Sequence, residues 1–432
     1  MKICMMTNTY LPHVGGVARS VSTFAEEFIR QGHEVLVVAP TFEGKPLPAK
    51  AEAIVERVPA IENFNGSEFS VRLPLATGLS DRLEAFQADI IHAHHPFLLG
   101  DTALRIAQNK NVPIVFTHHT RYEDYTHYMP LASEALTQVA KELPTHFANL
   151  CDGVLAPSES IARIIRRRGV TAPIKIAPTG IDVASFASAD GTSFRKKLKI
   201  PTDAVVIGHV GRLAQEKNLG YLSEAVALML KGTKDARFLV VGDGPARDEM
   251  TAVFEKHGVA DRLILAGKRT GRPLREAYRA MDIFAFASLS ETQGMVVAEA
   301  MAAGLPVVAL NASGVREVVR DGENGFLLPT KATEEKFAQA LARIAKGREL
   351  RRKLGAGAQT TAAEFSRERS AARVLDFYAE VRRATRERRL LIELNPWQGI
   401  VQRLGLEWDL LATRTQTIAH AVFGDGSKAK AS

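Results

Sequence analysis

The fold of this chain is decided by the stretch Ser290-Glu291-Thr292-Gln293-Gly294-Met295-Val296-Val297-Ala298-Glu299-Ala300-Met301-Ala302-Ala303-Gly304-Leu305-Pro306. Apolar runs at 283–287 and 307–310 flank this stretch, so the region is typical of a strand, a loop, a helix and a second strand. Strands joined by helices form parallel sheets with helices on both faces. The sequence therefore predicts an α/β fold.

The start of the predicted helix suits an anionic ligand. Gly294 allows a ligand to approach the backbone closely, and the first turn of a helix offers unpaired N–H groups and a partial positive charge. Glu291 lies on the loop and Glu299 more than one helical turn later, and both can accept hydrogen bonds from hydroxyl groups. A phosphate-attracting helix start between two hydroxyl acceptors indicates a sugar nucleotide.

Composition limits the class of protein. With 432 residues, of which 46% are hydrophobic, the chain can form a large core and two or three domains. Cys4 and Cys151 belong to no paired motif and the N-terminus has no signal-peptide pattern, so we expect a cytoplasmic protein. The sequence has no run of about 18 apolar residues, so it predicts no membrane-spanning helix. The formal net charge of +8 favours anionic partners, which are nucleotides, nucleic acid or acidic lipid surfaces.

Two series of short apolar runs predict two parallel sheets. The runs lie at 2–7, 34–39, 89–93, 114–117, 153–156 and 175–177, and then at 205–210, 237–241, 263–266, 283–287, 307–310 and 325–328. Between the series, the regular pattern breaks around 178–182, and residues 185–202 are small, polar and basic, so we place the interdomain linker here. We predict domains at 1–183 and 184–365, followed at 366–432 by C-terminal helices that cross back to the first domain and a basic tail.

Ligands bind at the carboxyl ends of parallel strands, so functional groups are expected there. Gly15 and Gly16 follow the first strand and precede a helix that is expected to begin near Ser20. Their N–H groups can reach a phosphate, and the alternative is an ordinary glycine turn. The third glycine of a G-x-G-x-x-G motif is missing, which disfavours hydride transfer.

Histidines gather at two further strand ends, as His92, His94, His95, His118 and His119. A metal site is one interpretation. However, no acidic or cysteine partner has a recognised ligand spacing with them, so we expect no metal. Instead, one or two histidines are expected to line a substrate site. The loop 119–128 adds Arg and Tyr side chains, which can hold a polar acceptor or form a surface loop with ion pairs.

In the second half, the loop after the strand at 205–210 contains Gly211, Arg212 and Lys217. Arg212 and Lys217 can anchor a diphosphate, since one charged hydrogen bond contributes roughly 1.5 to 3 kcal/mol. A local pair between Arg212 and Glu216 is the alternative.

The next two strands end in glycine turns at 242–245 and 267–269. We expect Gly242, Lys268 and Arg269 to approach the nucleotide there. No D-x-D pair is present, so a metal-bridged diphosphate is not indicated.

Two basic segments can contact an anionic lipid surface. One is the amphipathic helical pattern at 160–168, for which a solvated helix face is the alternative. The other begins at Glu380, carries five arginines up to Arg389 and continues with apolar residues to Leu404. Packing of that second helix onto the first domain is an equal possibility.

Together these motifs resemble those of the retaining glycosyltransferases of family 4. Four elements carry the resemblance over roughly residues 1 to 380: Gly15-Gly16-Val17, the loop 211–217, Gly242-Asp243-Gly244-Pro245, and the E-x7-E pair Glu291 and Glu299. The resemblance implies the GT-B fold, with two facing Rossmann-like domains, an interdomain cleft and no required metal.

The resemblance also implies roles for these residues. Arg212 and Lys217 would hold the donor diphosphate and stabilise its charge as it leaves, Glu299 would bind the ribose, and Glu291 the transferred sugar. Backbone contacts would come from Gly294, Met295 and Val296, and Gly16 would close on the phosphate from the first domain. The active-site histidine would be His119, with His118 as the adjacent alternative.

The segments 94–100 and 120–125 resemble those of bacterial diacylglycerol glucosyltransferases. This resemblance implies transfer of a hexose from UDP-glucose to a lipid hydroxyl, by a protein attached peripherally to the inner face of the cell membrane. One alternative is the same donor chemistry on a soluble or polysaccharide acceptor. Another is a non-catalytic nucleotide-sugar or nucleic-acid binding protein, but the basic residues are dispersed and lack an aromatic stacking array, so we expect no nucleic acid partner.

Overall fold

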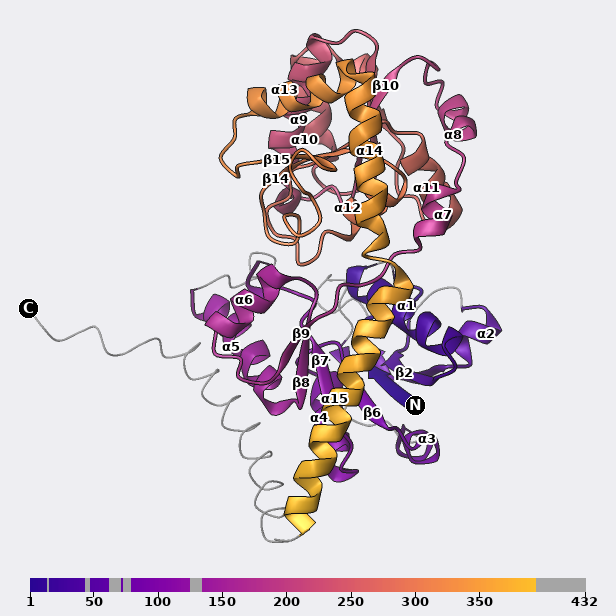
Figure 1. Ribbon diagram of the computed structural model, residues 1–432, viewed down its shortest axis with the longest axis vertical. Helices are drawn as coiled ribbons and strands as arrows, with labels where there is room; N and C mark the ends of the chain where they lie inside the picture. Colours follow the sequence, from indigo (N-terminus) through magenta and orange to yellow (C-terminus); the bar gives the residue numbers. More distant parts are fainter. Residues whose placement is uncertain (14, 43–46, 62–70, 73–78, 125–133, 394–432) are drawn as a thin grey trace, which may run out of the picture. The chain divides into compact units, whose positions relative to one another are not determined.

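The computed structural model describes residues 1–13, 15–42, 47–61, 71–72, 79–124 and 134–393 (Figure 1). The chain divides into two compact units. Unit 1 contains Met1–Pro178 and the described residues from Ser370 onward, and unit 2 contains Thr179–Arg369. The second change of unit lies in the first turn of the last helix, α15.

Unit 1 is built on a seven-stranded parallel sheet of order β3-β2-β1-β6-β7-β8-β9. Its strands are β1 (Lys2–Met6), β2 (Glu34–Pro40), β3 (Val55–Val58), β6 (Ile90–Ala93), β7 (Ile114–Thr117), β8 (Gly153–Ala156) and β9 (Ile174–Ile176). The six predicted strands are confirmed to within a residue or two at their ends. The prediction missed β3, because its sequence, Val-Glu-Arg-Val, alternates too briefly to be distinguished from a loop.

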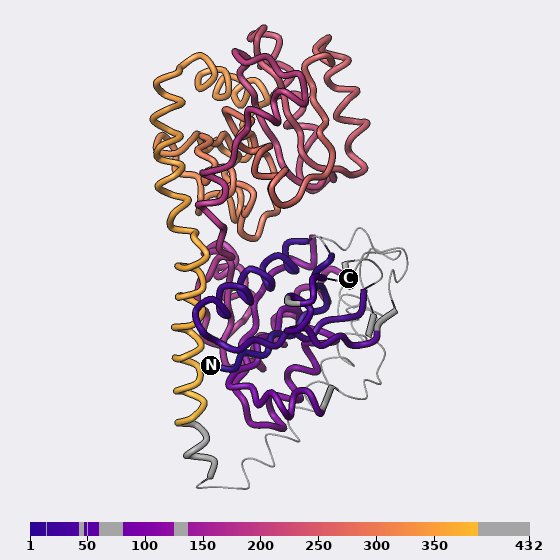
Figure 2. The backbone as a smooth tube through the Cα atoms, turned by 90° about the vertical axis from the view of Figure 1, so that its right-hand side faces the viewer, coloured from indigo at the N-terminus to yellow at the C-terminus, as the bar shows by residue number. Residues whose placement is uncertain are grey.

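Helices cover both faces of this sheet. They are α1 (Gly16–Arg30), α2 (Ala49–Glu52), α3 (Leu79–Phe86), α4 (Leu99–Asn109), α5 (Glu134–Leu150), α6 (Glu159–Arg167) and α15 (Arg367–Glu393). Helices α1 and α15 pack on one face and α3 to α6 on the other, and the course of α15 along the unit can be followed in Figure 2. A small antiparallel pair, β4 (Ala60–Ile61) and β5 (Val71–Arg72), lies outside the main sheet.

Helix α1 begins at Gly16, earlier than the predicted start near Ser20. The earlier start extends the buried stripe of the helix to Ala18, which the prediction had left in the loop.

Unit 2 contains a six-stranded parallel sheet of order β12-β11-β10-β13-β14-β15. Its strands are β10 (Val205–Val210), β11 (Ala236–Val241), β12 (Leu263–Leu265), β13 (Ile283–Phe286), β14 (Val307–Leu310) and β15 (Gly325–Leu328). Residues 290–306 form the loop and helix α12 that connect β13 to its neighbour β14 in this sheet. The predicted α/β class with two parallel sheets is confirmed.

The helices of unit 2 also form two layers. They are α7 (Val183–Ala187), α8 (Thr192–Lys197), α9 (Leu219–Lys231), α10 (Arg247–Lys256), α11 (Gly271–Arg279), α12 (Met295–Ala302), α13 (Glu334–Lys346) and α14 (Arg348–Ala363), with the short 3-10 helices η3 (Gln215–Lys217) and η4 (Ala260–Arg262). Helices α9, α10 and α13 pack on one face of the sheet, and α7, α8, α11, α12 and α14 on the other.

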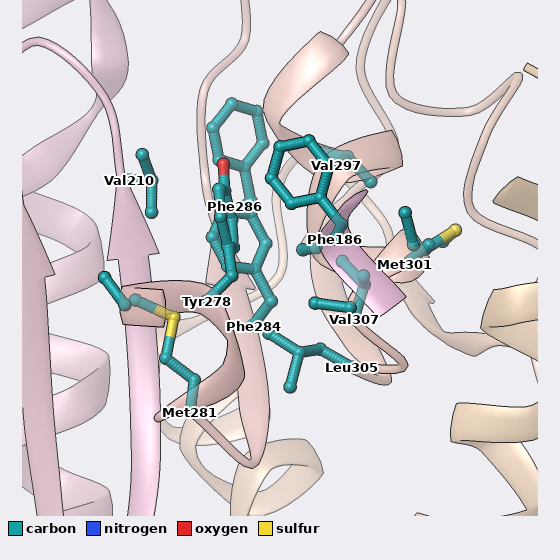
Figure 3. Close-up of a cluster of buried hydrophobic side chains, with 14 of the residues drawn as sticks. Phe186, Val210, Tyr278, Met281, Phe284, Phe286, Val297, Met301, Leu305 and Val307 are labelled. Carbon is teal, nitrogen blue, oxygen red and sulfur yellow. The ribbon is translucent and has the colours of Figure 1, made fainter. Parts of the chain in front are cut away.

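The two units divide between Pro178 and Thr179, within the predicted break at 178–182, but the extension of the predicted linker over 185–202 is wrong. This segment contains α8 and the end of α7 within unit 2, and Phe186 and Phe194 are buried in its core. Phe186 packs edge-on against Tyr278 with 5.5 Å between ring centroids (Figure 3). Two aromatic anchors fold the segment onto the sheet in spite of its polar, basic composition.

Candidate active site

The carboxyl ends of three neighbouring strands of unit 2 continue as glycine turns. The Gly211 N–H donates to the Val241 carbonyl at 3.0 Å, and the Gly242 N–H donates to the Gly267 carbonyl at 3.2 Å. A Cβ atom on Gly242 would lie 1.8 Å from the Gly211 carbonyl oxygen, so only glycine fits at this position. The glycines bring the loops after β10, β11 and β12 together at one edge of the sheet.

An ion pair joins the loop after β10 to the loop after β13. Nζ of Lys217 lies 2.6 Å from Oε1 of Glu291, and both side chains are mostly buried. Burial alone would raise the pKa of Glu291, but the charge and hydrogen bond of Lys217 hold that pKa below its ordinary value. The structure thus brings together two of the predicted site residues in their charged forms.

Arg212 is paired locally. Its Nη2 atom lies 2.5 Å from Oε1 of Glu216, four residues later on the same loop. The local pair between Arg212 and Glu216, the predicted alternative to diphosphate binding, is therefore present. Half of the Arg212 side chain is nevertheless exposed.

The E-x7-E loop is held in place by backbone and amide contacts. Gly294 has a φ of 74° as the residue before α12, a conformation that favours glycine. The Gln293 side chain accepts a hydrogen bond from the Thr179 N–H and donates one to the Thr179 carbonyl, both at 2.7 Å. The loop is therefore anchored to the first residue of unit 2, and Met295 and Val296 follow as half-buried residues in the first turn of α12.

Glu299 lies inside unit 2, where no part of its side chain is exposed. The Tyr278 hydroxyl from α11 donates a hydrogen bond to its Oε2 at 2.9 Å. The predicted contact between Glu299 and a ribose remains a prediction. In this structure the carboxylate is oriented by a tyrosine of the core.

The other predicted donor-site residues occupy different environments. Lys268 and Arg269 follow β12 and are exposed. In unit 1, Gly15 precedes α1 in an extended conformation and Gly16 is the first residue of that helix. Their predicted contacts with a phosphate remain predictions.

The histidines of unit 1 lie together at the carboxyl ends of β6 and β7. Nδ1 of His94 is 2.9 Å from Nε2 of His119, and the His92 and His94 rings are in contact, tilted by 37° with 3.9 Å between their centroids. His118 is almost fully buried and packs edge-on against Phe116, whereas His119 is half-buried. His119 is therefore the more accessible of the two candidates for an active-site histidine. Within the described ranges, no group of three or more His, Cys, Asp or Glu side chains is arranged to hold a metal ion.

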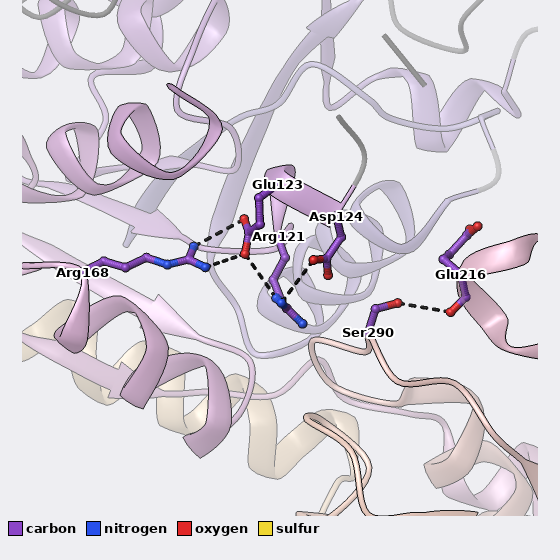
Figure 4. A network of polar contacts seen from close by, with 6 residues as sticks. All are labelled: Arg121, Glu123, Asp124, Arg168, Glu216 and Ser290. Atoms are coloured by element: carbon purple, nitrogen blue, oxygen red, sulfur yellow. Dashed lines mark hydrogen bonds and ion pairs between the residues drawn. The ribbon is translucent and has the colours of Figure 1, made fainter. Parts of the chain in front are cut away.

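The loop after His119 is fixed by ion pairs (Figure 4). Glu123 is nearly buried and bonds to the Arg168 guanidinium at the end of α6, and the Arg121 Nε atom approaches the same carboxylate at 3.3 Å. Arg121 also pairs with Asp124 at 3.1 Å. The ion pairs of the surface-loop alternative are thus present at 121–124, and the rest of the predicted aromatic loop, 125–128, lies outside the described residues.

The helices that carry the two basic segments, α6 and α15, both make contacts within unit 1. In α6, Ile161 and Ile165 are buried in the core of unit 1, so its apolar face is not available for a membrane and only its arginine face is exposed. In α15, Arg382 pairs with Asp89 at 2.7 Å. The apolar tail beyond residue 393 lies outside the described part of the chain, whose helices include none that is both long and apolar enough to span a bilayer.

Comparison with known proteins identifies the family. Residues 190–361 match the family model described as glycosyl transferases group 1, and residues 14–185 match the model described as glycosyltransferase family 4. An alpha-monoglucosyldiacylglycerol synthase of Streptococcus pneumoniae is 31% identical over 335 residues, which cover 76% of this chain and 75% of the relative. The chain belongs to glycosyltransferase family 4.

Other proteins that resemble this glycosyltransferase differ in their donors or in the ligand they bind. A GDP-mannose-dependent alpha-mannosyltransferase of Mycobacterium tuberculosis is 30% identical over 356 residues, covering 81% of this chain and 89% of the relative. The HepE protein of Anabaena, solved in complex with UDP, has a TM-score of 0.71 at 21% identity, over 88% of this chain and all of that one. This likeness confirms the predicted GT-B fold.

Two residues of the glycosyltransferase site, His209 beside the Lys217–Glu291 pair and Tyr278 beside Glu299, were not predicted from the sequence. His209 is buried at the end of β10, its Nδ1 atom is 3.2 Å from the Ala285 carbonyl oxygen, and burial lowers its pKa to about 4. Its position two residues before Gly211, on the same face of the strand, was a usable signal. Tyr278, the partner of Glu299, had no such signal because the two residues lie on different helices.

Proposed function

We propose that this glycosyltransferase moves a hexose, glucose from UDP-glucose, onto a hydroxyl group of a membrane lipid such as diacylglycerol, with retention of configuration. The observation that carries the donor half of the proposal is the pair of Lys217 and Glu291 at the edge of the unit 2 sheet. A fixed ammonium suits a diphosphate, and a carboxylate beside it suits sugar hydroxyls. The Streptococcus pneumoniae relative, an alpha-monoglucosyldiacylglycerol synthase, supports the lipid acceptor.

In the proposed reaction, the bond from the anomeric carbon to the diphosphate oxygen breaks ahead of attack. Lys217 and Arg212 meet the charge that develops on the leaving diphosphate. The acceptor hydroxyl attacks from the face that the diphosphate leaves, and the departing phosphate oxygen takes its proton. Preorganised charges of this kind are usually the largest catalytic term. Because fixed cations supply the counter-charge, we propose that transfer requires no divalent metal and continues in the presence of EDTA.

The proposal includes peripheral attachment to the inner face of the cell membrane. Its support is the exposed arginine face of α6, which carries Arg163, Arg166 and Arg167. Each arginine near an anionic bilayer contributes about 1 kcal/mol of attraction.

A donor and acceptor screen tests the proposal. The full-length protein is incubated with UDP-glucose or GDP-mannose, with vesicles containing diacylglycerol or with soluble glycosides, and the products are measured by mass spectrometry. A hexosyl diacylglycerol formed from UDP-glucose is the expected product. A mannosylated product would instead favour GDP-mannose as the donor, as for the Mycobacterium tuberculosis relative. Product on soluble glycosides alone would refute the lipid acceptor.

A further inference from the structure

The hydrogen bond between His94 and His119 determines what His119 can do. Nδ1 of His94 and Nε2 of His119 are 2.9 Å apart, and the rings stack with 20° between their planes. In a hydrogen bond between two neutral imidazoles, one nitrogen donates and the other accepts. The direction of this bond therefore decides which nitrogen of His119 carries its hydrogen.

Both rings are neutral near pH 7. Burial lowers the pKa of His94 and the pKa of His119 well below 6.5, and the neighbouring histidines His92 and His95 lower both further. Each ring then has a single N–H group, so only two arrangements of the pair are possible.

The surroundings of His94 distinguish the two arrangements. His94 is fully buried, and its Nε2 atom has no hydrogen-bond partner within the part of the chain that the structure describes. A hydrogen on Nε2 would leave a buried N–H donor unpaired, and such orphaned donors are rarer than under-satisfied acceptors. A hydrogen on Nδ1 leaves only a lone pair unmatched and is used in the bond to His119.

The ring of His94 is held in this orientation from its other side. The His92 ring packs against it at a tilt of 37°, with 3.9 Å between ring centroids. His92 is itself fixed at both nitrogens, by Thr117 Oγ1 and by the Tyr378 hydroxyl of α15, each at 2.6 Å. His94 is thus clamped between His92 and His119.

We propose that His94 is a positioning residue that donates its Nδ1–H to Nε2 of His119, so that His119 presents Nδ1–H to the substrate. His119 then acts on an oxygen of the sugar or the acceptor as a hydrogen-bond donor, and it cannot act as a base through that nitrogen. This inference rests on the proposed function for its catalytic consequence. It agrees with a reaction in which the leaving phosphate oxygen, and no side chain, takes the acceptor proton.

A ¹⁵N NMR spectrum of the full-length, ligand-free protein tests which nitrogen of His119 carries the hydrogen. Two-bond couplings between ring protons and ¹⁵N-labelled histidine nitrogens distinguish the two neutral forms. We expect the Nδ1–H form for His119 in the wild-type protein and a mixture of forms in His94→Ala. A wild-type His119 in the Nε2–H form, or an unchanged His119 spectrum in His94→Ala, would overturn the proposal. The wild-type spectrum decides even where His94→Ala does not fold.

Kinetics add an independent readout. Loss of the hydrogen-bond partner of a metal-bound histidine lowers activity about 10- to 100-fold. By analogy, His94→Ala should lower kcat by about this factor with little change in KM for the nucleotide sugar. His94→Asn places an amide N–H near the position of Nδ1 and should recover most of the activity, whereas equal losses in the two variants would contradict a donor role. The matched control is His33→Ala, which should leave kcat unchanged. His33 is a partly buried histidine outside the cluster, and its ring contacts the amino group of Met1. A wild-type protein with the Nδ1–H form that transfers no hexose supports the hydrogen-bond assignment while it refutes the proposed function.

Discussion

Nζ of Lys217 lies 2.6 Å from Oε1 of Glu291, although the two residues are 74 positions apart in the chain. The pair joins the loops that follow β10 and β13, two hydrogen-bonded strands of unit 2. Neither side chain is fully buried, so both charges can respond to a ligand at this edge.

The first prediction concerns the cation of this pair. Lys217→Ala should lower kcat about 100-fold or more, because it removes a preorganised charge for the leaving diphosphate. Lys256→Ala, which breaks an exposed Lys–Glu pair of the same unit, is the control and should leave kcat unchanged. Transfer rates from UDP-glucose, with circular dichroism to confirm folding, provide the measurement. Near-normal turnover in Lys217→Ala would contradict the role of this residue.

Replacing each of the two glutamates of the E-x7-E pair should change a different kinetic constant. Glu291→Ala should mainly reduce kcat, since it removes the group expected on the transferred sugar. Glu299→Ala should mainly raise KM for the nucleotide sugar, and Tyr278→Phe should raise it in the same direction but less, because only the orienting hydrogen bond is lost. Steady-state kinetics with varied UDP-glucose distinguish these cases. Identical losses in Glu291→Ala and Glu299→Ala would argue against separate roles.

The glycine turn after β11 should tolerate no side chain. Gly242→Ala places a methyl group 1.8 Å from the Gly211 carbonyl oxygen, and relieving such overpacking typically costs about 1 to 3 kcal/mol. The shift should displace the loop that carries Arg212 and so reduce transfer as well as stability. Gly232→Ala is the control, because its added methyl group would meet nothing closer than 3.7 Å. Urea unfolding and transfer assays of both variants test this, and equal stability would contradict it.

Stability should fall in mild acid because of the histidines of unit 1. Burial lowers the pKa of His92 and of His95 to about 3 and that of His118 to about 4, from 6.5. Below pH 6.5 the unfolded chain therefore binds more protons than the folded one, so the stabilising contribution is complete above pH 6.5 and is lost as pH falls toward these folded-state values. The urea midpoint followed by circular dichroism should be lower at about pH 5.5 than at about pH 7.5. A midpoint that does not change over this interval would count against buried neutral histidines.

Membrane attachment should depend on the arginine face of α6. Replacing Arg163, Arg166 and Arg167 with Glu should strongly reduce sedimentation with phosphatidylglycerol vesicles at low salt, since attraction to such a surface is electrostatic. The control replaces the exposed Arg272 and the partly buried Arg275 of α11 with Glu, which changes the net charge of unit 2 instead. Equal binding by the wild-type protein and the α6 variant would place the membrane contact elsewhere.

The sequence by itself determined the two parallel sheets, because apolar runs of strand length alternate with helical patterns in both halves of the chain. It also identified the loops that carry Lys217 and Glu291, because ligand groups follow strands directly at the carboxyl edge of such a sheet. These are local patterns, and spacing along the chain is enough to read them.

Only the tertiary structure decided which groups meet. The Lys217–Glu291 pair, the Tyr278 hydroxyl on Glu299 and the bond between His94 and His119 each join residues from different elements. The segment 185–202 has the composition of a linker but is folded by two buried aromatic rings. Pairing across a sheet depends on strand order, and burial depends on what packs above each residue, so neither can be read from the order of residues alone.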